Sequence, residues 1–406
     1  MSDALTVSVV IVSRQRPEAL RRCLTGVAQL MYHRFEVVVV ADPDSCTAMR
    51  DLPQAAHARL VACDTANVSA ARNVGIESAA GEIVAFIDDI SVPEPTWLHY
   101  LIAPFARQEV VAAGGFVRGR NGISFRNKAE WVDRTGKTGP IELAGEGSVM
   151  FSATADRAIR TVATNMAVRR SVLADIGGFD PVFRTGLGDT DLNLRLADLG
   201  HCTAIAPLAQ VHRGANDVRR AKGVARDLSD LGESWAVFLR KHCDEARLPD
   251  LLRRLKADQR RRALTRMIDG RLEPRDVRRL MESFERGWRA GLARERALMP
   301  RLAHPKEAFR PFVWQKLGPP SVLSGRFWSR SRLRAQALAK NGSVTVIRLS
   351  PTGLFHKVRF TNDGYWEQTG GMFGKSERTQ PLISFWTFGR RVRSEIDRIR
   401  EVRGLQ

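Results

Sequence analysis

The sequence predicts an α/β fold with a doubly wound sheet over its first half, and three observations carry this prediction. Short runs of apolar, β-branched residues recur along residues 1–115, as in Val7–Val12 and Phe35–Val40. A segment with apolar residues at helical spacing, Pro17–Leu30, separates those two runs, and the alternation then repeats. Runs that are apolar on both faces are typical of buried parallel strands, and helices that alternate with them cover the two faces of the sheet.

The individual elements follow from the same patterns. Pro17 suits the first turn of the helix that it begins. Further along we expect a weak strand, a helix of small residues and a buried strand, at Arg59–Ala62, Ser69–Ala80 and Ile83–Ile87. Residues 116–165 are rich in Gly, Ser, Thr and charge and show little periodicity, so loops are expected there.

Two helices and a strand are expected at the end of this half. The first helix, Arg169–Ile176, ends at a pair of glycines. The second, Asp189–Leu199, begins with an aspartate and is followed by Gly200, as helix caps require. The last strand is expected over Thr203–Ala206 and Gln210–Val211.

The second half has a different pattern. Residues 217–300 have helical periodicity with Arg on most exposed turns, and Ser343–Leu349 and Leu354–Phe360 alternate apolar and polar residues. The two alternating segments predict a small antiparallel meander, with a turn at residues 362–364. Phe385–Arg403 predicts a helix with one apolar face and Arg on the others. We therefore expect domains at 1–216, 217–335 and 336–406, the second mostly helical.

The charge is divided unevenly between the two halves. The chain of 406 residues has a formal net charge of +20, yet residues 1–200 carry 21 Lys+Arg and 23 Asp+Glu, a net of −2. The other residues carry 43 and 21, a net of +22. This division argues against a uniformly basic chromatin or ribosome-type protein, so nucleic acid is disfavoured as the partner.

The cysteines and the apolar runs indicate the compartment. Five scattered cysteines without a CxxC pair form neither a disulfide framework nor a zinc site, which suits a reducing environment. The N-terminus lacks the pattern of a signal peptide, and no run approaches the roughly 18–20 apolar residues that span a bilayer. We expect a cytoplasmic protein, with any membrane contact peripheral on the inner face.

Four groups of residues carry candidate chemistry. Asp88 and Asp89 end a buried strand, where α/β sheets bind ligands, and adjacent carboxylates suit a divalent cation that is shared with phosphate. The alternative for this pair is a solvated turn. Arg72, in NVSAARNVG, is placed to meet an anion. Asp189 is either a proton acceptor or a helix cap, and His212 is either a ligand or a packing residue.

The order and spacing of these pieces resemble family 2 glycosyltransferases, which have the GT-A fold. The resemblance covers about residues 5–215. The segments that carry it are VSVVIVSRQRPEALRRCL, FEVVVVADPDS, NVSAARNVG, GEIVAFIDD, ATNMAVRRS, IGGFDPVF, GLGDTDLNLRLADLG and VHRG.

The resemblance implies an activity and a set of site residues. Members of the family transfer a sugar from a nucleotide diphosphate, most often UDP, to an acceptor hydroxyl with inversion. Donor binding would involve Ser13, Asp42, Arg72, Asp88 and Asn165. A divalent cation, Mn²⁺ or Mg²⁺, would be bound by Asp89 and His212. The general base would be Asp189, with Asp191 in reserve. Such an enzyme would build a bacterial surface polysaccharide or glycolipid on a glycan or lipid-linked acceptor.

Two departures from the family pattern concern the acids. The family's aspartate triplet is here Asp88-Asp89-Ile90, so the third acid is absent. The usual Glu-Asp before the last helix is here Gly188-Asp189. These departures keep an alternative open, in which a catalytically degenerate GT-A scaffold holds an anionic partner through its basic half.

Three hypotheses for the basic half stay open. Arginines on helices are most often a solvated face whose long stems cover apolar surface. The terminal segment Phe385–Arg403 has the pattern of an interfacial helix, which would hold the protein on an anionic membrane. The third hypothesis is binding of an acidic polymer.

Overall fold

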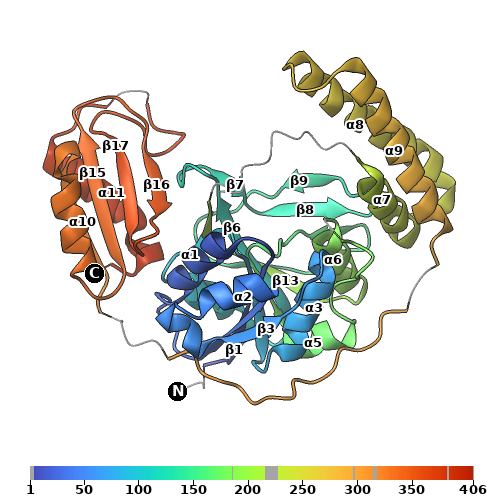
Figure 1. The fold of residues 1–406 in the computed structure, drawn as a ribbon, viewed down its shortest axis with the longest axis horizontal. Helices are drawn as coiled ribbons and strands as arrows, with labels where there is room; N and C mark the ends of the chain where they lie inside the picture. The colour runs from blue at the N-terminus through green and yellow to red at the C-terminus, as the bar shows by residue number, and fades with distance from the viewer. Residues whose placement is uncertain are drawn as a thin grey trace.

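The computed structural model describes residues 4–184, 186–214, 227–295, 298–313, 318–381 and 384–405. A ten-stranded mixed sheet forms the centre of an N-terminal domain. Figure 1 shows a helical unit, residues 229–293, on one side of this domain and a C-terminal unit, residues 318–381 and 384–405, on the opposite side. The expected α/β class with a mixed sheet is confirmed.

The first half of the sheet is parallel, as expected. Strand β1 pairs with β2 and with β4, and β2 pairs with β3, all in parallel. The elements are β1 (Val7–Ser13), α1 (Pro17–Val27), β2 (Phe35–Ala41), α2 (Pro43–Met49), β3 (Arg59–Ala62), α3 (Val68–Ser78) and β4 (Ile83–Asp88). Successive residues of β1 face opposite cores: Val9 and Ile11 pack with α1, and Val10 packs with α3.

The small residues of α3 allow the close helix–sheet packing that their pattern predicts. A methyl group added at Gly75 would lie 2.5 Å from Cγ1 of Val10, closer than carbon atoms approach. The helix axis therefore lies near β1, and the start of α3 is brought to the edge where β1 and β4 end.

The second half of the sheet makes it mixed. Strand β12 is antiparallel to both β4 and β6, and β13 runs parallel to β6. The elements here are β5 (Ser91–Pro93), α4 (Trp97–Ile102), β6 (Val110–Arg118), β12 (Met166–Arg169), α5 (Arg170–Asp175), α6 (Gly188–Asp198) and β13 (Cys202–Arg213). The expected last strand is confirmed as one continuous strand.

The prediction of loops over residues 116–165 was wrong. The region contains β7 (Phe125–Asn127), β8 (Glu130–Asp133), β9 (Thr138–Pro140), β10 (Val149–Phe151) and β11 (Arg157–Ile159). Strands β11, β8 and β9 form a separate antiparallel sheet. These strands have three or four residues and are mostly half-exposed, so they carry too little apolar alternation to be recognised from sequence.

The helical unit confirms the expected helices in the described part of residues 217–300. It contains α7 (Ser229–His242), α8 (Leu248–Ile268) and α9 (Pro274–Ala293). Its core includes Phe238 and Phe284, which pack with Phe183 and Leu194 of the N-terminal domain. This contact places α7 against α6.

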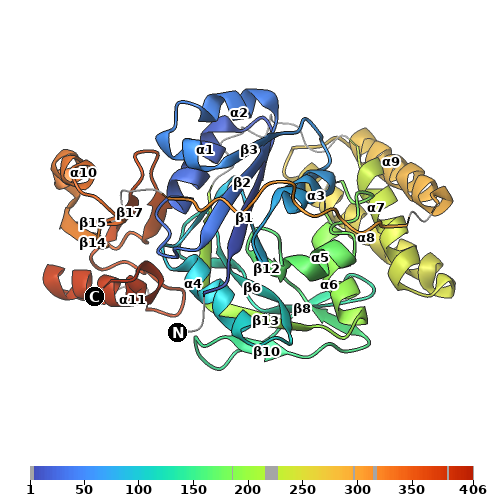
Figure 2. The same ribbon diagram turned by 90° about the horizontal axis from the view of Figure 1, so that it is seen from below.

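An extended segment, residues 298–313, crosses the N-terminal domain from the helical unit towards the C-terminal unit (Figure 2). The backbone amide of Leu302 donates to the carbonyl of Ala174 at 3.0 Å. At the other end, the amide of Phe312 donates to the carbonyl of Phe35 at 2.8 Å, and the two rings pack together. We call this segment the strap, because it attaches to the domain at both ends.

The C-terminal unit corrects both the expected domain boundary and the expected sheet. It contains β14 (Ser321–Arg326), α10 (Arg330–Leu338), β15 (Val344–Ser350), β16 (Lys357–Phe360), β17 (Trp366–Gly371) and α11 (Phe388–Arg403). Only β16 and β17, around the predicted turn, are antiparallel; β14, β15 and β17 are parallel. Because β14 pairs with β15 and residue 336 lies within α10, the unit begins before the expected boundary.

The interfacial membrane helix expected at Phe385–Arg403 is also corrected. Val392, Ile399 and Val402 of α11 are buried, and Val392 packs with Ile347 and Leu349 of β15. The apolar face of α11 therefore covers the unit's own sheet, whereas Phe385, which precedes the helix, is exposed. In the part of the chain that the structure describes, no helix has the length and apolar character needed to cross a membrane.

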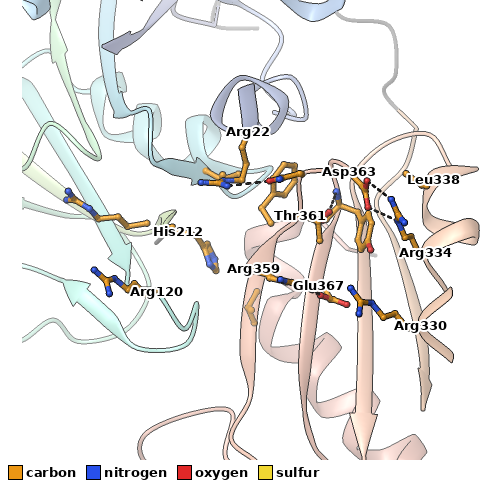
Figure 3. A pocket seen from close by; sticks show the side chains of 18 of the residues that line it. Arg22, Arg120, His212, Arg330, Arg334, Leu338, Arg359, Thr361, Asp363 and Glu367 are labelled. Atoms are coloured by element: carbon orange, nitrogen blue, oxygen red, sulfur yellow. Dashed lines mark hydrogen bonds and ion pairs between the residues drawn. The ribbon is translucent and has the colours of Figure 1, made fainter. Parts of the chain in front are cut away.

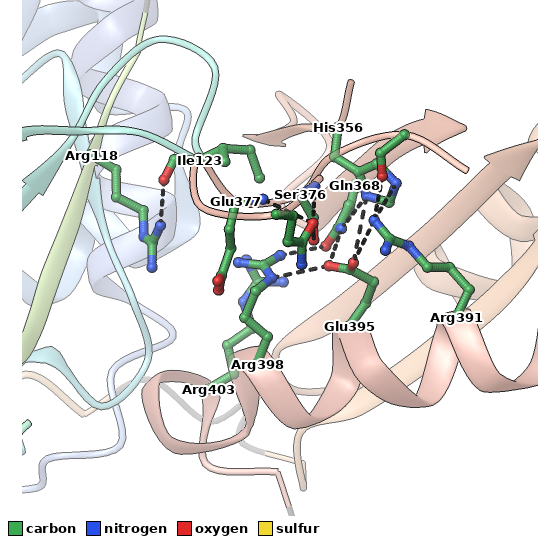
Figure 4. A network of polar contacts seen from close by, with 12 residues as sticks. Arg118, Ile123, His356, Gln368, Ser376, Glu377, Arg391, Glu395, Arg398 and Arg403 are labelled. Atoms are coloured by element: carbon green, nitrogen blue, oxygen red, sulfur yellow. Dashed lines mark hydrogen bonds and ion pairs between the residues drawn. The ribbon is translucent and has the colours of Figure 1, made fainter. Parts of the chain in front are cut away.

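A buried polar network holds α11 on the sheet (Figure 4). Glu395 accepts a hydrogen bond from Gln368 at 2.7 Å and forms ion pairs with Arg391 at 3.1 Å and Arg398 at 3.0 Å. Arg391 and Glu395 are each 1% exposed. Since the removal of one partner of a buried ion pair leaves an unpaired charge, this network ties the arginines of α11 to the fold.

The C-terminal unit docks on the N-terminal domain through a second buried cluster. Glu94 accepts hydrogen bonds from Nε of Arg403 at 3.0 Å and from Nε2 of His212 at 2.7 Å. The Arg403 guanidinium and the His212 ring both lie 4.6 Å from the ring centre of Trp366. Thr96 adds a hydrogen bond to the carbonyl of Val402 at 2.7 Å.

Because of this cluster, we expect the free energy of unfolding to fall as the pH is lowered. Burial lowers the pKa of His212 to about 4, against the opposite effect of Glu94. Burial would raise the pKa of Glu94, but Arg403 and His212 outweigh it and lower that pKa to about 2. The unfolded chain therefore binds more protons than the folded chain below pH 6.5, the ordinary pKa of His. Between pH 7 and pH 4 we expect a loss of about 3 kcal/mol in the free energy of unfolding.

Urea unfolding at a series of pH values measures this loss. The variant His212→Gln lacks the titrating ring, so its stability should fall less between pH 6.5 and pH 4 than that of the wild type. An unchanged pH dependence in the variant would show that other groups dominate the acid response.

Candidate active site

A cavity of about 260 Å³ opens where β1 and β4 end, and we call it the strand-end cavity. The two strands are neighbours, with Val12 opposite Asp88 in the register. The walls of the cavity come from the loop after β1, the start of α3, the end of β4 and the end of β13. Ligands of α/β proteins bind at this edge of the sheet. The residues with polar side chains along its wall are Ser13, Arg14, Arg16, Thr65, Arg72, Asp88 and Arg213.

Asp88 faces the strand-end cavity, and cations surround it. Its side chain is 26% exposed and accepts a hydrogen bond from Oγ1 of Thr164 at 2.7 Å. Nη2 of Arg72 and Nη1 of Arg213 each lie 3.7 Å from its carboxylate oxygens. The expected binding residue Asp88 is therefore brought together with the expected anion-binding residue Arg72.

Asp189 lies outside the lining of the strand-end cavity and reaches the same arginine from α6. Nη1 of Arg72 lies 2.8 Å from Oδ1 of Asp189, and the amide of Ala163 donates to Oδ2 at 3.0 Å. The carboxylate stands in the first turn of α6 and is 28% exposed. The guanidinium of Arg72 lies 5.0 Å from the ring centre of Phe179, which fixes its position between Asp88 and Asp189.

Backbone strain is found on both sides of the site. Leu187, directly before α6, has φ 61°, and Gln15, in the loop after β1, has φ 55°. Residues other than glycine rarely adopt this left-handed region, and such conformations persist where the surrounding contacts impose them. Gln15 is held by the hydrogen bond from its amide to Oδ2 of Asp42 at 2.7 Å.

Asp89 is buried behind residues that line the strand-end cavity and does not line it itself. It is 1% exposed, accepts a hydrogen bond from Oγ of Ser13 at 2.7 Å and pairs with Nε of Arg16 at 2.9 Å. Burial raises its pKa to about 6, although Arg16 and Ser13 act in the opposite direction. Asp89 is the first residue of the turn after β4 and its carboxylate is committed to Ser13 and Arg16, so the two aspartates do not act as a pair. The expected role of Asp89 as a metal ligand is corrected to a contact that anchors the loop after β1.

His212 also lies elsewhere than its expected role requires. Its Nε2 is occupied by Glu94, its ring packs on Trp366, and its Nδ1 is buried without a hydrogen-bond partner. Among the residues that the structure describes, no group of three or more His, Cys, Asp or Glu side chains is arranged to hold a metal ion. The residues expected to bind Mn²⁺ or Mg²⁺ therefore do not fit such an ion.

Asp191, the expected reserve base, is corrected to a structural residue. It is fully buried and pairs with Arg195 at 2.8 Å, Lys241 at 2.8 Å and His242 at 2.9 Å. Burial would raise its pKa, but the hydrogen bond from His242 and the charges of Arg195 and Lys241 hold it well below its usual range. This carboxylate joins α6 to α7 and has no open side for a substrate.

Three expected donor-binding residues make internal contacts. Asn165 is fully buried, accepts from the indole of Trp97 at 2.7 Å and donates to the carbonyls of Phe116 and Ala209. Asp42 caps α2 and accepts from Ser45 as well as Gln15; burial would raise its pKa, but these hydrogen bonds lower it. Ser13 lines the cavity while its hydroxyl is bonded to Asp89. Asn165 and Asp42 thus position the loops of the site, and their expected contacts with the donor stay a prediction.

A larger cleft adjoins the strand-end cavity, between the N-terminal domain and the C-terminal unit (Figure 3). Its volume is about 1080 Å³. We call it the arginine cleft, because six arginines line it and only two acids, Asp363 and Glu367, do so. The arginines are Arg22, Arg120, Arg213, Arg330, Arg334 and Arg359. Since Arg213 lines both hollows, a ligand in the cleft would lie next to one in the strand-end cavity.

Sequence reasoning missed Arg213 and Thr164, and one signal was available. Arg213 follows His212 in a strand, so the two side chains must point to opposite faces. Only one of them can face the strand-end cavity, and the structure shows that it is Arg213. Thr164 lies in the segment that was expected to be a loop, where no pattern indicated its contact with Asp88.

The chain is similar in sequence to several curated proteins. Curated relatives include the O-antigen biosynthesis protein RfbC of Myxococcus xanthus, 29% identical over 246 residues. That match covers 57% of this chain and 19% of the relative. The pre-mycofactocin glycosyltransferase of Mycobacterium tuberculosis is 27% identical over 213 residues, 50% of this chain and 42% of the relative. The chain therefore spans less than half the length of either relative.

A solved structure with a similar fold is that of GalNAc-T7 with UDP, GalNAc and Mn²⁺. It is 14% identical, with a TM-score of 0.47, and the match covers 59% of this chain and 48% of that one. The model of the family described as "Glycosyltransferase like family 2" matches residues 4–230, more than half of the chain. The chain therefore belongs to the family 2 glycosyltransferases.

Proposed function

We propose that the protein transfers a sugar from a nucleoside diphosphate donor to an acceptor hydroxyl, with inversion at the anomeric carbon. The observation that carries this proposal is the position of Arg72, which lines the strand-end cavity and joins Asp88 there to Asp189 beside it. Asp189, which is 28% exposed, offers a carboxylate able to accept a proton, and the cations that line the cavity suit a diphosphate.

The reaction proceeds in one displacement. The acceptor oxygen attacks the anomeric carbon and loses its proton to Asp189, while the bond from that carbon to the β-phosphate oxygen breaks. The electron pair of the broken bond stays on the phosphate, so the nucleoside diphosphate leaves with an added negative charge. Arg72 and Arg213 lie at the strand-end cavity where this charge develops, and fixed cations at such a position lower the barrier. Attack from the side opposite the leaving group inverts the anomeric configuration.

The arginine cleft supports an acceptor that carries phosphate or carboxylate groups. Its lining has four more arginines than acids, and it meets the strand-end cavity at Arg213. A glycan or lipid-linked acceptor with an anionic group would be drawn to this cleft. The name of the RfbC relative, an O-antigen biosynthesis protein, supports a surface polysaccharide or glycolipid as the product.

A screen of donors tests the function. The full chain is incubated with UDP-, GDP-, CDP- and dTDP-sugars, UDP-sugars first, and its melting temperature is recorded. A ligand that binds the folded state raises the melting temperature by mass action. We expect one nucleotide class to do so, and we expect Arg72→Ala to weaken its binding about tenfold or more. Arg50→Ala, an exposed arginine at the end of α2, is the matched control.

Failure of every nucleotide sugar to bind the wild type would contradict the proposal. Binding without any release of nucleoside diphosphate, in the presence of acceptors, would instead favour a scaffold that has kept the fold and lost the reaction. The observations that favour such a scaffold are the buried position of Asp89 and the apolar side chain of Ile90.

A further inference from the structure

In the described part of the chain, a single carboxylate, that of Asp88, lines the strand-end cavity. A divalent cation bound there would be expected to have more than one carboxylate ligand. Asp88 and Ile90 both line the cavity, and Asp89 between them does not. Strand β4 ends at Asp88, and Asp89 and Ile90 belong to the turn that follows it. The residue of this turn that lines the cavity with Asp88 is therefore apolar, at the place where the family's third acid is absent.

Neither of the other expected ligands can move to the cavity without breaking buried contacts. Asp89 is held by Ser13 and Arg16, and its release would leave a cation unpaired. His212 is held by Glu94 and Trp366 in the cluster that docks the C-terminal unit. Hard divalent cations are bound by several oxygen ligands, and here the described side chains of the cavity supply Asp88 alone as an ionised one.

Cations replace the missing acids. Arg14, Arg16, Arg72 and Arg213 line the strand-end cavity against the single carboxylate of Asp88. Arg16 is committed to Asp89, and Arg14 pairs with Asp64 at 3.1 Å at the surface. Nη1 of Arg72 is bonded to Asp189 at 2.8 Å, which holds this guanidinium at the cavity. Nη2 of Arg72 and Nη1 of Arg213 lie 3.7 Å from Asp88, longer than charge-assisted hydrogen bonds, so these donors are placed to meet an anion.

The positive charge also extends beyond the cavity. Burial lowers the pKa of Arg126, and the nearby cations Arg213 and Arg120 lower it further. Like charges that are crowded together in a folded protein raise its free energy, and an anionic ligand relieves that cost. Guanidinium groups suit phosphate, because their planar fork offers two parallel donors.

We propose that the donor's diphosphate is bound by the guanidinium groups of Arg72 and Arg213, so that donor binding and transfer require no divalent cation. This inference rests on the proposed function, since it concerns the same donor. The charge that develops on the leaving diphosphate is stabilised by these two arginines, and the remaining steps are unchanged.

The first experiment measures nucleoside diphosphate binding by calorimetry, with UDP, GDP, CDP and dTDP each as the probe. Every titration is made in excess EDTA and again in Mn²⁺ or Mg²⁺. We expect the probe that binds to do so with the same affinity, within about threefold, in both conditions. Binding that weakens about tenfold or more in EDTA overturns the inference. If no probe binds in either condition, the proposed function itself fails, which is a different result.

The second experiment replaces Arg213, which the inference assigns to the diphosphate, and an arginine outside the site as its control. Arg213→Ala should weaken binding of the probe in EDTA about tenfold or more, whereas Arg332→Ala, an exposed arginine of α10 outside both hollows, should not. An Arg213→Ala variant that binds like the wild type contradicts the assignment. Melting curves of both variants show whether each is folded.

A gain of metal binding provides an independent readout. Ile90→Asp places a second carboxylate at the cavity that Asp88 and Ile90 line, so the variant with UDP should take up Mn²⁺, measured by the loss of the EPR signal of free Mn²⁺. Ile90→Asn has the same size without the charge and should not. Mn²⁺ uptake by the wild type equal to that of Ile90→Asp would overturn the inference, and so would no uptake by a folded Ile90→Asp variant.

Discussion

Replacing Asp189 with Asn is expected to abolish sugar transfer while donor binding is retained. Asn keeps the shape of the side chain and its contact with the amide of Ala163, but it cannot take the proton of the acceptor hydroxyl. General-base catalysis contributes about 10²- to 10⁴-fold to a rate, so kcat should fall by a factor in that range. Initial rates of nucleoside diphosphate release with acceptor, together with calorimetry of the donor, measure the two effects separately.

The same helix offers a matched control. Asp198, at the end of α6, is half-exposed and pairs with Arg134 far from the strand-end cavity. Asp198→Asn should leave both kcat and donor binding unchanged. An Asp189→Asn variant with the rate of the wild type would show that another group takes the proton, and the proposed role of Asp189 would be lost.

Replacing Asp191 with Ala is expected to destabilise the protein by roughly 3–5 kcal/mol, the cost of removing one partner of a buried ion pair. Its carboxylate is fully buried and faces three groups that can carry positive charge, Arg195, Lys241 and His242. Without it, those groups lie close together with no anion between α6 and α7. Urea unfolding followed by circular dichroism measures the change in the free energy of unfolding.

An exposed aspartate again provides the comparison. Asp198→Ala removes a surface ion pair, which contributes about 0–1 kcal/mol. If Asp191→Ala is no more destabilising than Asp198→Ala, the buried cluster does not hold the helical unit on the N-terminal domain. The consequence would be that Asp191 is free for another role, including the one that the sequence suggested.

The sheet and the edge at which it binds ligands were predictable, because they depend on local periodicity. Apolar runs such as those of β1 and β2, separated by helical patterns, specify buried parallel strands wherever they occur. Their carboxyl ends then meet at one edge, and Asp88 at the end of β4 lies there as expected. The short strands of residues 125–159 lack such a pattern, and they were missed.

The direction of each polar side chain was not predictable from the local pattern. Asp89 is turned inward by Ser13 and Arg16, more than seventy residues earlier in the chain. Asp191 is held by residues of α7 about fifty positions later, and His212 by Glu94. A carboxylate at a strand end has the same local sequence whether it faces a ligand or a buried arginine.

The sequence by itself determined the α/β sheet, the family and the position of the candidate site along the chain. The tertiary structure decided that Asp88 faces the cavity, that Asp189 meets Arg72 beside it, and that Asp89 and Asp191 make internal contacts. It also decided that the arginines of the second half serve in part as ion-pair partners, as Arg403 and Arg391 do. The physical reason is that periodicity is a property of neighbouring residues, whereas burial and ion pairing are set by contacts between distant ones.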